Sequence, residues 1–318
     1  MELFLYILLV AIGFVLLVKG ADLLVDGASS LAGKLGISTL VVGLTVVALG
    51  TSMPELVVNV YAALTGVADI AIGNIVGSNI VNIALILGLS AALYPLHVQR
   101  STVWKEIPFA LIAVVLVAIM ASDVVLDGMV SNVISRSDGL VLLAFTAIFF
   151  YYILGMVRSG DSPVIDDSSS SSLKLIFYIV IGIGLLVAGG KLAVDGAVGV
   201  AAAAGLSERV IGLTIVAIGT SLPELVTSLV AAYKKQPDLS VGNIVGSNIL
   251  NIFLILGLSS IIRPLPFQGE SFVDVGVAVA LTIMLFAFMF LGRRHVLERW
   301  QGIGFVIIYT AYTAHLFF

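Results

Sequence analysis

Long apolar segments separated by short polar turns follow one another along the whole chain of 318 residues. A helix needs about 20 mostly apolar residues to cross a bilayer. Ten segments meet this requirement, at approximately residues 3–27, 37–65, 70–93, 107–122, 139–157, 174–199, 208–233, 239–262, 272–291 and 300–317. The alternating pattern that the strands of a membrane barrel require is not apparent. The pattern therefore predicts an all-α membrane protein with ten transmembrane helices.

Two parts of this pattern occur twice. Residues 43–59, GLTVVALGTSMPELVVN, match residues 212–228, GLTIVAIGTSLPELVTS, at 12 of 17 positions, and residues 71–90 match residues 240–259 at 16 of 20. Both matches have the same offset of 169 residues, which predicts two homologous units. Each unit holds five predicted helices, an odd number, so the second must enter the membrane from the opposite side. The sequence thus predicts two inverted-topology five-helix repeats.

The predicted repeats are residues 1–157 and 174–318, and a different kind of sequence joins them. Residues 158–173, RSGDSPVIDDSSSSSL, are serine-rich and acidic. Such a composition is typical of a flexible linker, which we expect on the cytoplasmic side. The alternative is a phosphorylation or calcium-sensing role for its three aspartates.

Basic residues in the predicted loops indicate how the chain is oriented. If both termini are outside, ten basic residues fall on the inner side and three on the outer side. The inner ones are Lys34, Arg100, Lys105, Arg158, Lys174, Lys234, Lys235, Arg293, Arg294 and Arg299, and the outer ones are Arg136, Arg209 and Arg263. Because cytoplasmic loops carry the excess of Lys and Arg, we expect a multi-pass protein of the cell membrane with both termini extracellular.

Composition excludes several classes of function. Hydrophobic residues make up 60% of the chain and charged residues only 11%, and the net charge is −4. This leaves no basic surface for nucleic acid. The absence of cysteine excludes disulfides and thiol chemistry. There is no HExxH motif, and the three histidines, His97, His295 and His315, are scattered at predicted loops or ends. We therefore predict neither an enzyme nor a cofactor.

Two glutamates lie near the centres of predicted spans. Glu55 and Glu224 occupy equivalent positions in the two repeats. A charge at the bilayer centre costs at least about 2.5–3.5 kcal/mol, so such residues usually face a cavity and carry function. No lysine or arginine lies at comparable depth on a predicted span. A mobile cation or a proton is the obvious counter-charge.

The residues before each glutamate add oxygen atoms. Thr51 and Ser52 stand four and three residues before Glu55, on the same helical face. Pro54 lacks an N–H group, so it should kink the helix and free the carbonyl four residues back. The equivalent residues of the second repeat are Thr220, Ser221, Pro223 and Glu224. Carboxylate, hydroxyl and carbonyl oxygens together suit Ca²⁺ or Na⁺ better than softer metals.

The next predicted helix carries polar residues at every fourth position. Asn74, Ser78 and Asn82 share one face, and their equivalents are Asn243, Ser247 and Asn251. A structural hydrogen-bonding role is favoured for Asn74 and Asn243, whereas the other four are candidates for the ion site. The glycines of the same helices form GxxxG pairs, which are typical of close helix packing.

The paired motifs resemble a known family. GTSMPE with GNIVGSN, and GTSLPE with GNIVGSN, are similar to the two α-repeats of the cation/calcium exchanger superfamily, in particular its sodium/calcium exchanger branch. The resemblance implies that Glu55 and Glu224 are shared ligands of the calcium and sodium sites. It also implies side-chain ligands at Thr51, Ser52, Ser78, Asn82, Thr220, Ser221, Ser247 and Asn251, and main-chain carbonyl ligands at Ala48 and Ala217. Finally, it implies that the first and sixth helices slide across the other eight.

Two departures from the family pattern concern charge and regulation. Some microbial members carry aspartate where this chain has Asn251, which leaves two central carboxylates here. The sodium stoichiometry and any proton occupancy at this position therefore stay open. The predicted linker is too short for the calcium-sensing domain of animal members, so regulation by such a domain is not expected.

These observations predict a secondary active antiporter that exchanges Na⁺ for Ca²⁺ by alternating access. The alternatives are a proton/calcium exchanger of the same fold, a cation channel and, least favoured, a membrane enzyme. The expected partners are Ca²⁺, Na⁺ and the lipid bilayer, and the sequence is compatible with a monomer.

Overall fold

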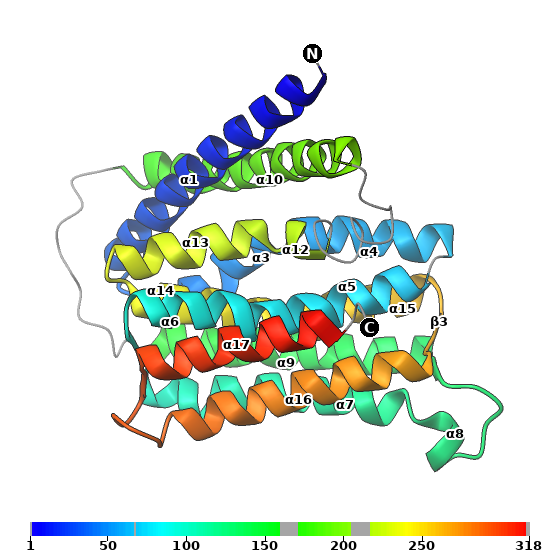
Figure 1. The fold of residues 1–318 in the computed structure, drawn as a ribbon. Coiled ribbons are helices and arrows are strands. Elements are labelled where there is room, and N and C mark those ends of the chain that lie inside the picture. Colours follow the sequence, from blue (N-terminus) through cyan, green and yellow to red (C-terminus); the bar gives the residue numbers. More distant parts are fainter. Residues whose placement is uncertain (1, 67, 160–170, 205–216, 316–318) are drawn as a thin grey trace.

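The computed structural model describes residues 2–66, 68–159, 171–204 and 217–315, and these residues are mostly helical (Figure 1). The first part contains α1 (Glu2–Leu35), α2 (Thr39–Val42), η1 (Gly43–Val47), α3 (Ala48–Thr51), α4 (Met53–Thr65), α5 (Ala68–Ile80), η2 (Val81–Leu87), α6 (Gly88–Leu93), η3 (Thr102–Glu106), α7 (Ile107–Met120), α8 (Asp123–Leu126) and α9 (Arg136–Ser159). The second part contains α10 (Ser172–Ala203), α12 (Ala217–Gly219), α13 (Leu222–Tyr233), α14 (Pro237–Leu250), η5 (Asn251–Leu256), α15 (Gly257–Ile262), α16 (Gly269–Phe288) and α17 (Arg299–His315). Elements marked η are π-helical. Most of the predicted linker, and Arg209, lie outside the described residues.

The helices are long and apolar enough for a membrane protein. Seven stretches of the described residues meet this test, and Thr39–Thr51 with Met53–Thr65, bent by 49°, make an eighth if they form one span. The predicted span at 208–233 is described only in part, and the predicted last span corresponds to the 17-residue α17. A helical membrane protein is thus confirmed, whereas the number of ten spans stays a prediction.

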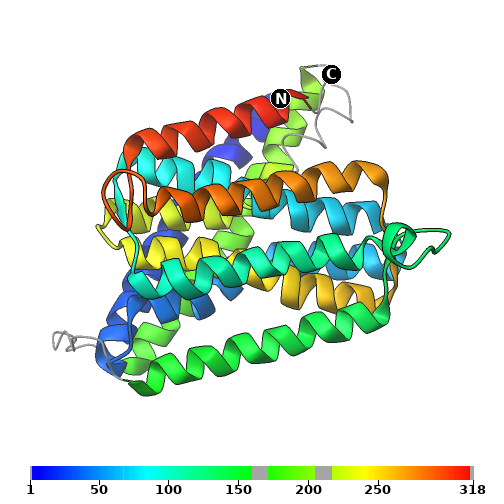
Figure 2. The ribbon, with the colours of Figure 1, turned by 90° about the horizontal axis from the view of Figure 1, so that it is seen from below.

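The two repeated motifs occupy the centre of the molecule. In the stretches Ala71–Leu93 and Pro237–Ile262, 78% and 83% of the most apolar window is buried, against 17% in α1. The chain leaves the middle of the molecule in opposite directions along α4 and α13 (Figure 1). Seen at right angles, the other helices surround this centre (Figure 2).

The longest helices, α1 and α10, pack against each other in antiparallel orientation. A Cβ atom built on Gly20 would lie 2.8 Å from the main-chain oxygen of Gly182, and one on Gly182 would lie 2.8 Å from that of Gly20. Gly13 and Gly189 approach each other in the same way. Both helices continue beyond the predicted spans, α1 to Leu35 through a last turn that contains Lys34 and α10 to Ala203 through a last turn of small apolar residues.

Short strands join the two halves of the sequence at two places. Strand β1 (Leu96–His97) pairs antiparallel with β4 (Val296–Leu297), and β2 (Val133–Ile134) pairs antiparallel with β3 (Leu265–Pro266). Each pair therefore combines one strand from before residue 158 with one from after residue 173.

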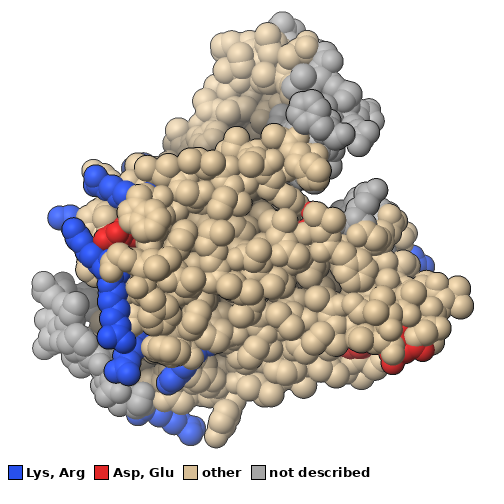
Figure 3. All heavy atoms as spheres, turned by 60° about the horizontal axis from the view of Figure 1, so that its bottom comes forward, with Lys and Arg blue, Asp and Glu red and all other residues tan. Residues whose placement is uncertain are grey.

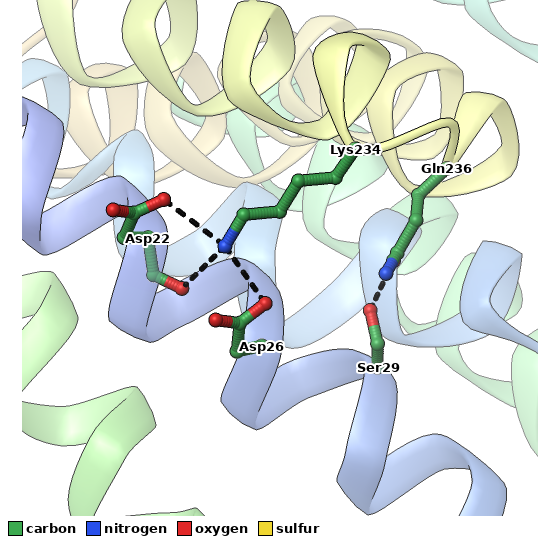
Figure 4. A network of polar contacts seen from close by, with 5 residues as sticks. All are labelled: Asp22, Asp26, Ser29, Lys234 and Gln236. Atoms are coloured by element: carbon green, nitrogen blue, oxygen red, sulfur yellow. Dashed lines mark hydrogen bonds and ion pairs between the residues drawn. The ribbon is translucent and has the colours of Figure 1, made fainter.

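One end of the molecule is basic. Most of the Lys and Arg side chains in view gather there, together with a few Asp and Glu atoms, whereas a second group of Asp and Glu side chains lies at the opposite end (Figure 3). Near α13, Lys234 Nζ lies 3.0 Å from Asp22 Oδ1 and 2.8 Å from Asp26 Oδ1, both on α1 (Figure 4). The Ser29 hydroxyl also donates to Gln236, so both Lys234 and Gln236 hold α1 to the segment after α13.

Candidate ion-binding site

The first motif folds as a broken helix. Helix α3 ends at Thr51 and α4 begins at Met53, because Ser52 has a non-helical backbone with φ −83° and ψ 11°. Pro54 occupies the first turn of α4, where its missing N–H group is tolerated. Glu55 lies in the same turn, at the end of the helix where the partial positive charge favours a carboxylate. The predicted break is therefore observed, and it exposes this turn to the centre of the molecule.

The second motif has the same geometry in its described part. Ser221 has φ −88° and ψ 7°, Pro223 lies in the first turn of α13, and Glu224 lies in the same turn. Both glutamates are 1% exposed. The sequence around each of them thus produces the same local structure twice.

The opposing helices change their winding near the site. Helix α5 continues into the π-helical turn η2, which contains Asn82, and α14 continues into η5, which begins at Asn251. Such turns are rare and are frequently found at functional sites. Ser78 and Ser247 lie about one turn earlier, and both are buried.

Glu224 is held by serines from both halves of the sequence. Ser52 Oγ donates a hydrogen bond of 2.7 Å to Glu224 Oε1, and Ser247 Oγ lies 3.5 Å from the same oxygen. The two hydroxyls also bond to each other at 3.0 Å. Ser52 comes from the first motif, so the contact with Glu224 crosses between the halves.

Glu55 has the matching arrangement. Ser221 Oγ donates to Glu55 Oε1 at 3.2 Å and Ser78 Oγ donates to it at 3.3 Å, and the two serines lie 3.2 Å apart. The structure therefore brings together the glutamates and the four serines that the sequence singled out.

Each threonine bonds to an asparagine of the other half. Thr51 Oγ1 donates to Asn243 Oδ1 at 3.0 Å, and Thr220 Oγ1 donates to Asn74 Oδ1 at 3.2 Å. These bonds give the two asparagines the structural role favoured from the sequence. Each threonine hydroxyl therefore links its own motif to a helix of the other half.

The two main-chain carbonyls predicted as ligands, those of Ala48 and Ala217, belong to helical segments. The main-chain oxygen of Ala48 accepts from the Ser52 amide at 3.0 Å and from Thr51 Oγ1 at 3.3 Å. Ala217 begins helix α12. A ligand role for either oxygen stays a prediction.

Nine buried side-chain oxygen atoms have no hydrogen-bond partner among the described residues, and four of them occupy equivalent positions in the two repeated motifs. These four are Glu55 Oε2, Glu224 Oε2, Asn82 Oδ1 and Asn251 Oδ1. They form two pairs of equivalent positions, 169 residues apart. Burying an unpartnered acceptor is costly, so nearly all are satisfied in native proteins. Two carboxylate and two amide oxygens form a donor set suited to hard cations such as Ca²⁺ and Na⁺.

The charge of this site comes from two carboxylates. Among the described residues, no group of three or more His, Cys, Asp and Glu side chains is placed to hold a metal ion. This agrees with the sequence, in which residue 251 is asparagine. Glu55 and Glu224 are close enough for their charges to repel each other. A bound cation would therefore stabilise both.

Sequence reasoning missed two residues next to the site, Asn79 and Asn248. Both are buried and bond to each other's main chain and to the side chains of Asn251 and Asn82. The prediction followed the helical face through Ser78, and these asparagines lie one residue away from that face. Their presence in both copies of the GSN motif was the available signal.

Comparison with known proteins identifies the family. A profile described as sodium/calcium exchanger protein matches residues 5–155 and 174–318. The chain belongs to the sodium/calcium exchanger protein family. The exchanger family resemblance inferred from the paired motifs is thereby confirmed, and so is the interpretation of the chain as a membrane antiporter.

Individual relatives support the same assignment. The chain is 34% identical to the sodium/calcium exchanger MaX1 of Methanosarcina acetivorans over 345 residues, 98% of each chain. It is 38% identical to the inner membrane protein YrbG of Escherichia coli over 266 residues, 80% of this chain and 79% of YrbG. A solved structure of the sodium-calcium exchanger NCX_Mj, soaked with 10 mM Na⁺ and 10 mM Sr²⁺, is similar at a TM-score of 0.84 with 35% identity over 98% of each chain. The chain is therefore a cation/Ca²⁺ exchanger in fold and family.

Proposed function

We propose that this protein exchanges Na⁺ for Ca²⁺ at one shared site between the two motifs, by alternating access. The observation that carries the proposal is the set of four buried, unpartnered oxygens on Glu55, Glu224, Asn82 and Asn251. Each lies on a broken or π-helical segment that brings it to the centre of the molecule.

Two carboxylates balance the charge of one Ca²⁺. Na⁺ has a similar size and also prefers oxygen ligands, so selectivity would depend on ligand charge and number. Both ions need Glu55 and Glu224, and competition for these residues would couple their movements. Two bare carboxylates in a low-dielectric site are costly, so the empty carrier would cross between its two states only rarely.

The remaining ligands complete the proposed site. Thr51, Ser52 and Ser78 would bind ions on one side of the midplane, and Thr220, Ser221 and Ser247 on the other. The Ala48 and Ala217 carbonyls would contribute from the broken helices. In this proposal the serine hydroxyls, now bonded to the glutamates, turn their oxygens toward an arriving cation.

The proposed architecture has ten transmembrane helices in two inverted repeats, residues 1–157 and 174–318, joined by the linker at 158–173. The opposite directions of α4 and α13 support the inversion. The basic end would face the cytoplasm of a cell-membrane protein with extracellular termini. The antiparallel pair α1 and α10 would slide across the other helices to alternate access, and one chain would suffice.

Flux measurements in proteoliposomes test this function. Vesicles loaded with Na⁺ should take up Ca²⁺, with the membrane potential clamped and with a protonophore present. Replacing internal Na⁺ with choline should abolish uptake. Uptake that needs no Na⁺ and is lost when a pH gradient collapses would establish proton/calcium exchange instead. Single-channel currents without exchange would establish a channel.

A further inference from the structure

The orientation of two amide side chains beside the site is fixed by main-chain atoms. Asn79 Nδ2 donates to the main-chain oxygen of Asn248 at 3.1 Å, and Asn248 Nδ2 donates to that of Asn79 at 3.5 Å. A carbonyl oxygen can only accept, so each amide must turn its nitrogen toward it. The side-chain oxygens of both residues are thereby directed elsewhere.

These oxygens accept from the two asparagines of the proposed site. Asn251 Nδ2 donates to Asn79 Oδ1 at 3.1 Å, and Asn82 Nδ2 donates to Asn248 Oδ1 at 2.9 Å. An oxygen acceptor requires a donor opposite it. The Nδ2 atoms of Asn251 and Asn82 are therefore held facing Asn79 and Asn248, respectively. Asn251 Oδ1 and Asn82 Oδ1 are consequently the atoms left without a donor.

The alternative orientation would be unfavourable for a cation. An amide rotated by 180° about its last side-chain bond would present its NH₂ group, which only donates and carries partial positive charge. In an unrestrained asparagine both orientations are accessible, since this torsion is broad. The four bonds therefore select the orientation that offers oxygen to an ion.

We infer that Asn79 and Asn248 are positioning residues that hold the amide oxygens of Asn251 and Asn82 toward the transported ions. This inference rests on the proposed function of the site. The pairing is crossed: each positioning residue acts on the site asparagine of the other half of the sequence. Neither positioning side chain depends on the other side chain, because each contacts only the other's main chain.

A double-mutant cycle separates positioning from simple helix packing. Asn79→Ala should raise the Ca²⁺ concentration for half-maximal uptake by roughly tenfold, as expected for loss of a residue that orients a metal ligand, with a smaller change in maximal rate. Asn251→Ala should raise it at least as much. The double variant should be no worse than Asn251→Ala, because Asn79 then has nothing to orient. Asn248→Ala and Asn82→Ala should behave in the same way.

The uncrossed pairs are the matched controls. The effects of Asn79→Ala and Asn82→Ala should multiply, as should those of Asn248→Ala and Asn251→Ala. Multiplying effects in the crossed pairs, or an unchanged half-maximal concentration in Asn79→Ala, would overturn the inference. If an alanine variant does not fold, serine replaces it, because its hydroxyl can bond within its own helix but is too short to replace the amide.

A second measurement keeps this inference distinct from the proposed function. Ca²⁺ added to the detergent-solubilised full chain should raise its unfolding temperature, and the Ca²⁺ concentration needed should follow the same crossed pattern. If the wild-type protein shows no Na⁺-dependent uptake, the proposed exchange fails. A crossed pattern in Ca²⁺ binding would still support the positioning role, and its absence would reject it.

Discussion

The Ser52 hydroxyl donates a 2.7 Å hydrogen bond to Glu224, a residue from the other half of the sequence. The equivalent bond from Ser221 to Glu55 measures 3.2 Å. The two motifs are nearly identical in sequence, yet the serine of each motif donates to the glutamate of the other motif rather than to its own. The difference in length makes the two halves of the site unequal.

Removing these hydroxyls should weaken calcium binding unequally. In the proposed site the Ser52 oxygen is itself an ion ligand, and a polar contact to a charged group contributes about 1.5–3 kcal/mol, so Ser52→Ala should raise the Ca²⁺ concentration for half-maximal uptake by about tenfold or more. Ser221→Ala should have the smaller effect. Ser259→Ala is the control, since this buried hydroxyl bonds to Ile255 in its own helix. Equal, negligible effects of the first two would contradict the arrangement.

Each site glutamate should be essential. Glu55→Gln or Glu224→Gln removes one of two negative charges but keeps the shape, and Ca²⁺ uptake into Na⁺-loaded vesicles should be abolished. Glu106 offers a matched control, because it is also 1% exposed but is bonded to Tyr152. Glu106→Gln should retain Na⁺-dependent uptake. Near-wild-type Ca²⁺ flux in both Glu55→Gln and Glu224→Gln would contradict the proposed site.

Asn251→Asp should change ion dependence. The new carboxylate adds a third charge, and one of its oxygens would face Asn79 Oδ1 where an amide now donates. Two acceptors repel unless the carboxyl is protonated or Asn79 turns. We expect altered Na⁺ or pH dependence of Ca²⁺ uptake, measured at fixed membrane potential between pH 6 and 9. Unchanged profiles would assign residue 251 a structural role only.

The contact between α1 and α10 should not tolerate a methyl group. In Gly20→Ala or Gly182→Ala the added Cβ meets main-chain oxygen at 2.8 Å, so the helices must separate. Overpacking of this kind typically costs about 1–3 kcal/mol, which should lower the unfolding temperature. Gly184 lies on the same helix as Gly182, but a Cβ atom added there would meet no neighbouring atom within 4 Å. Gly184→Ala should therefore be neutral or stabilising.

Lys234 should hold α1 in place over a wide pH range. Burial alone would lower the pKa of this ammonium, but the bonds to Asp26 and Asp22 outweigh it and raise the pKa above the ordinary 10.5. A raised pKa stabilises the fold below the unfolded value, and this contribution is lost only as pH rises through the folded value. After correction for the intrinsic pH dependence of amide exchange, the protection of α1 should therefore be alike from pH 7 to 9, whereas Lys234→Gln should reduce this protection.

The sequence predicted the parts of the site but not how they meet. Helical spacing places Ser78 and Asn82 on one face, and the repeat places Ser247 and Asn251 likewise. Which residues of one half touch the other depends on how two inverted units pack, and spacing along one helix carries no such information. The crossed bond between Ser52 and Glu224 could not be predicted for this reason.

Helix ends were predicted less well than helix centres. Hydropathy ends the first span near residue 27, but α1 continues to Leu35. Asp22 and Asp26 find a partner in Lys234, which allows a polar stretch to stay helical and packed. Ser52 is an opposite example. It lies inside an apolar segment that was predicted as one span, but the helix is interrupted at this residue. Proline predicted that kink because its effect is local.

The two strand pairs bear on whether one half of this chain could fold without the other. Within the described part of the chain, strand β1 pairs with β4 alone and β2 with β3 alone. An isolated half would leave strand edges, serine hydroxyls and a buried carboxylate without the groups that now satisfy them. In the proposed site, each half thus depends on groups of the other, and the smallest unit able to surround an ion contains two halves, whether or not a peptide joins them.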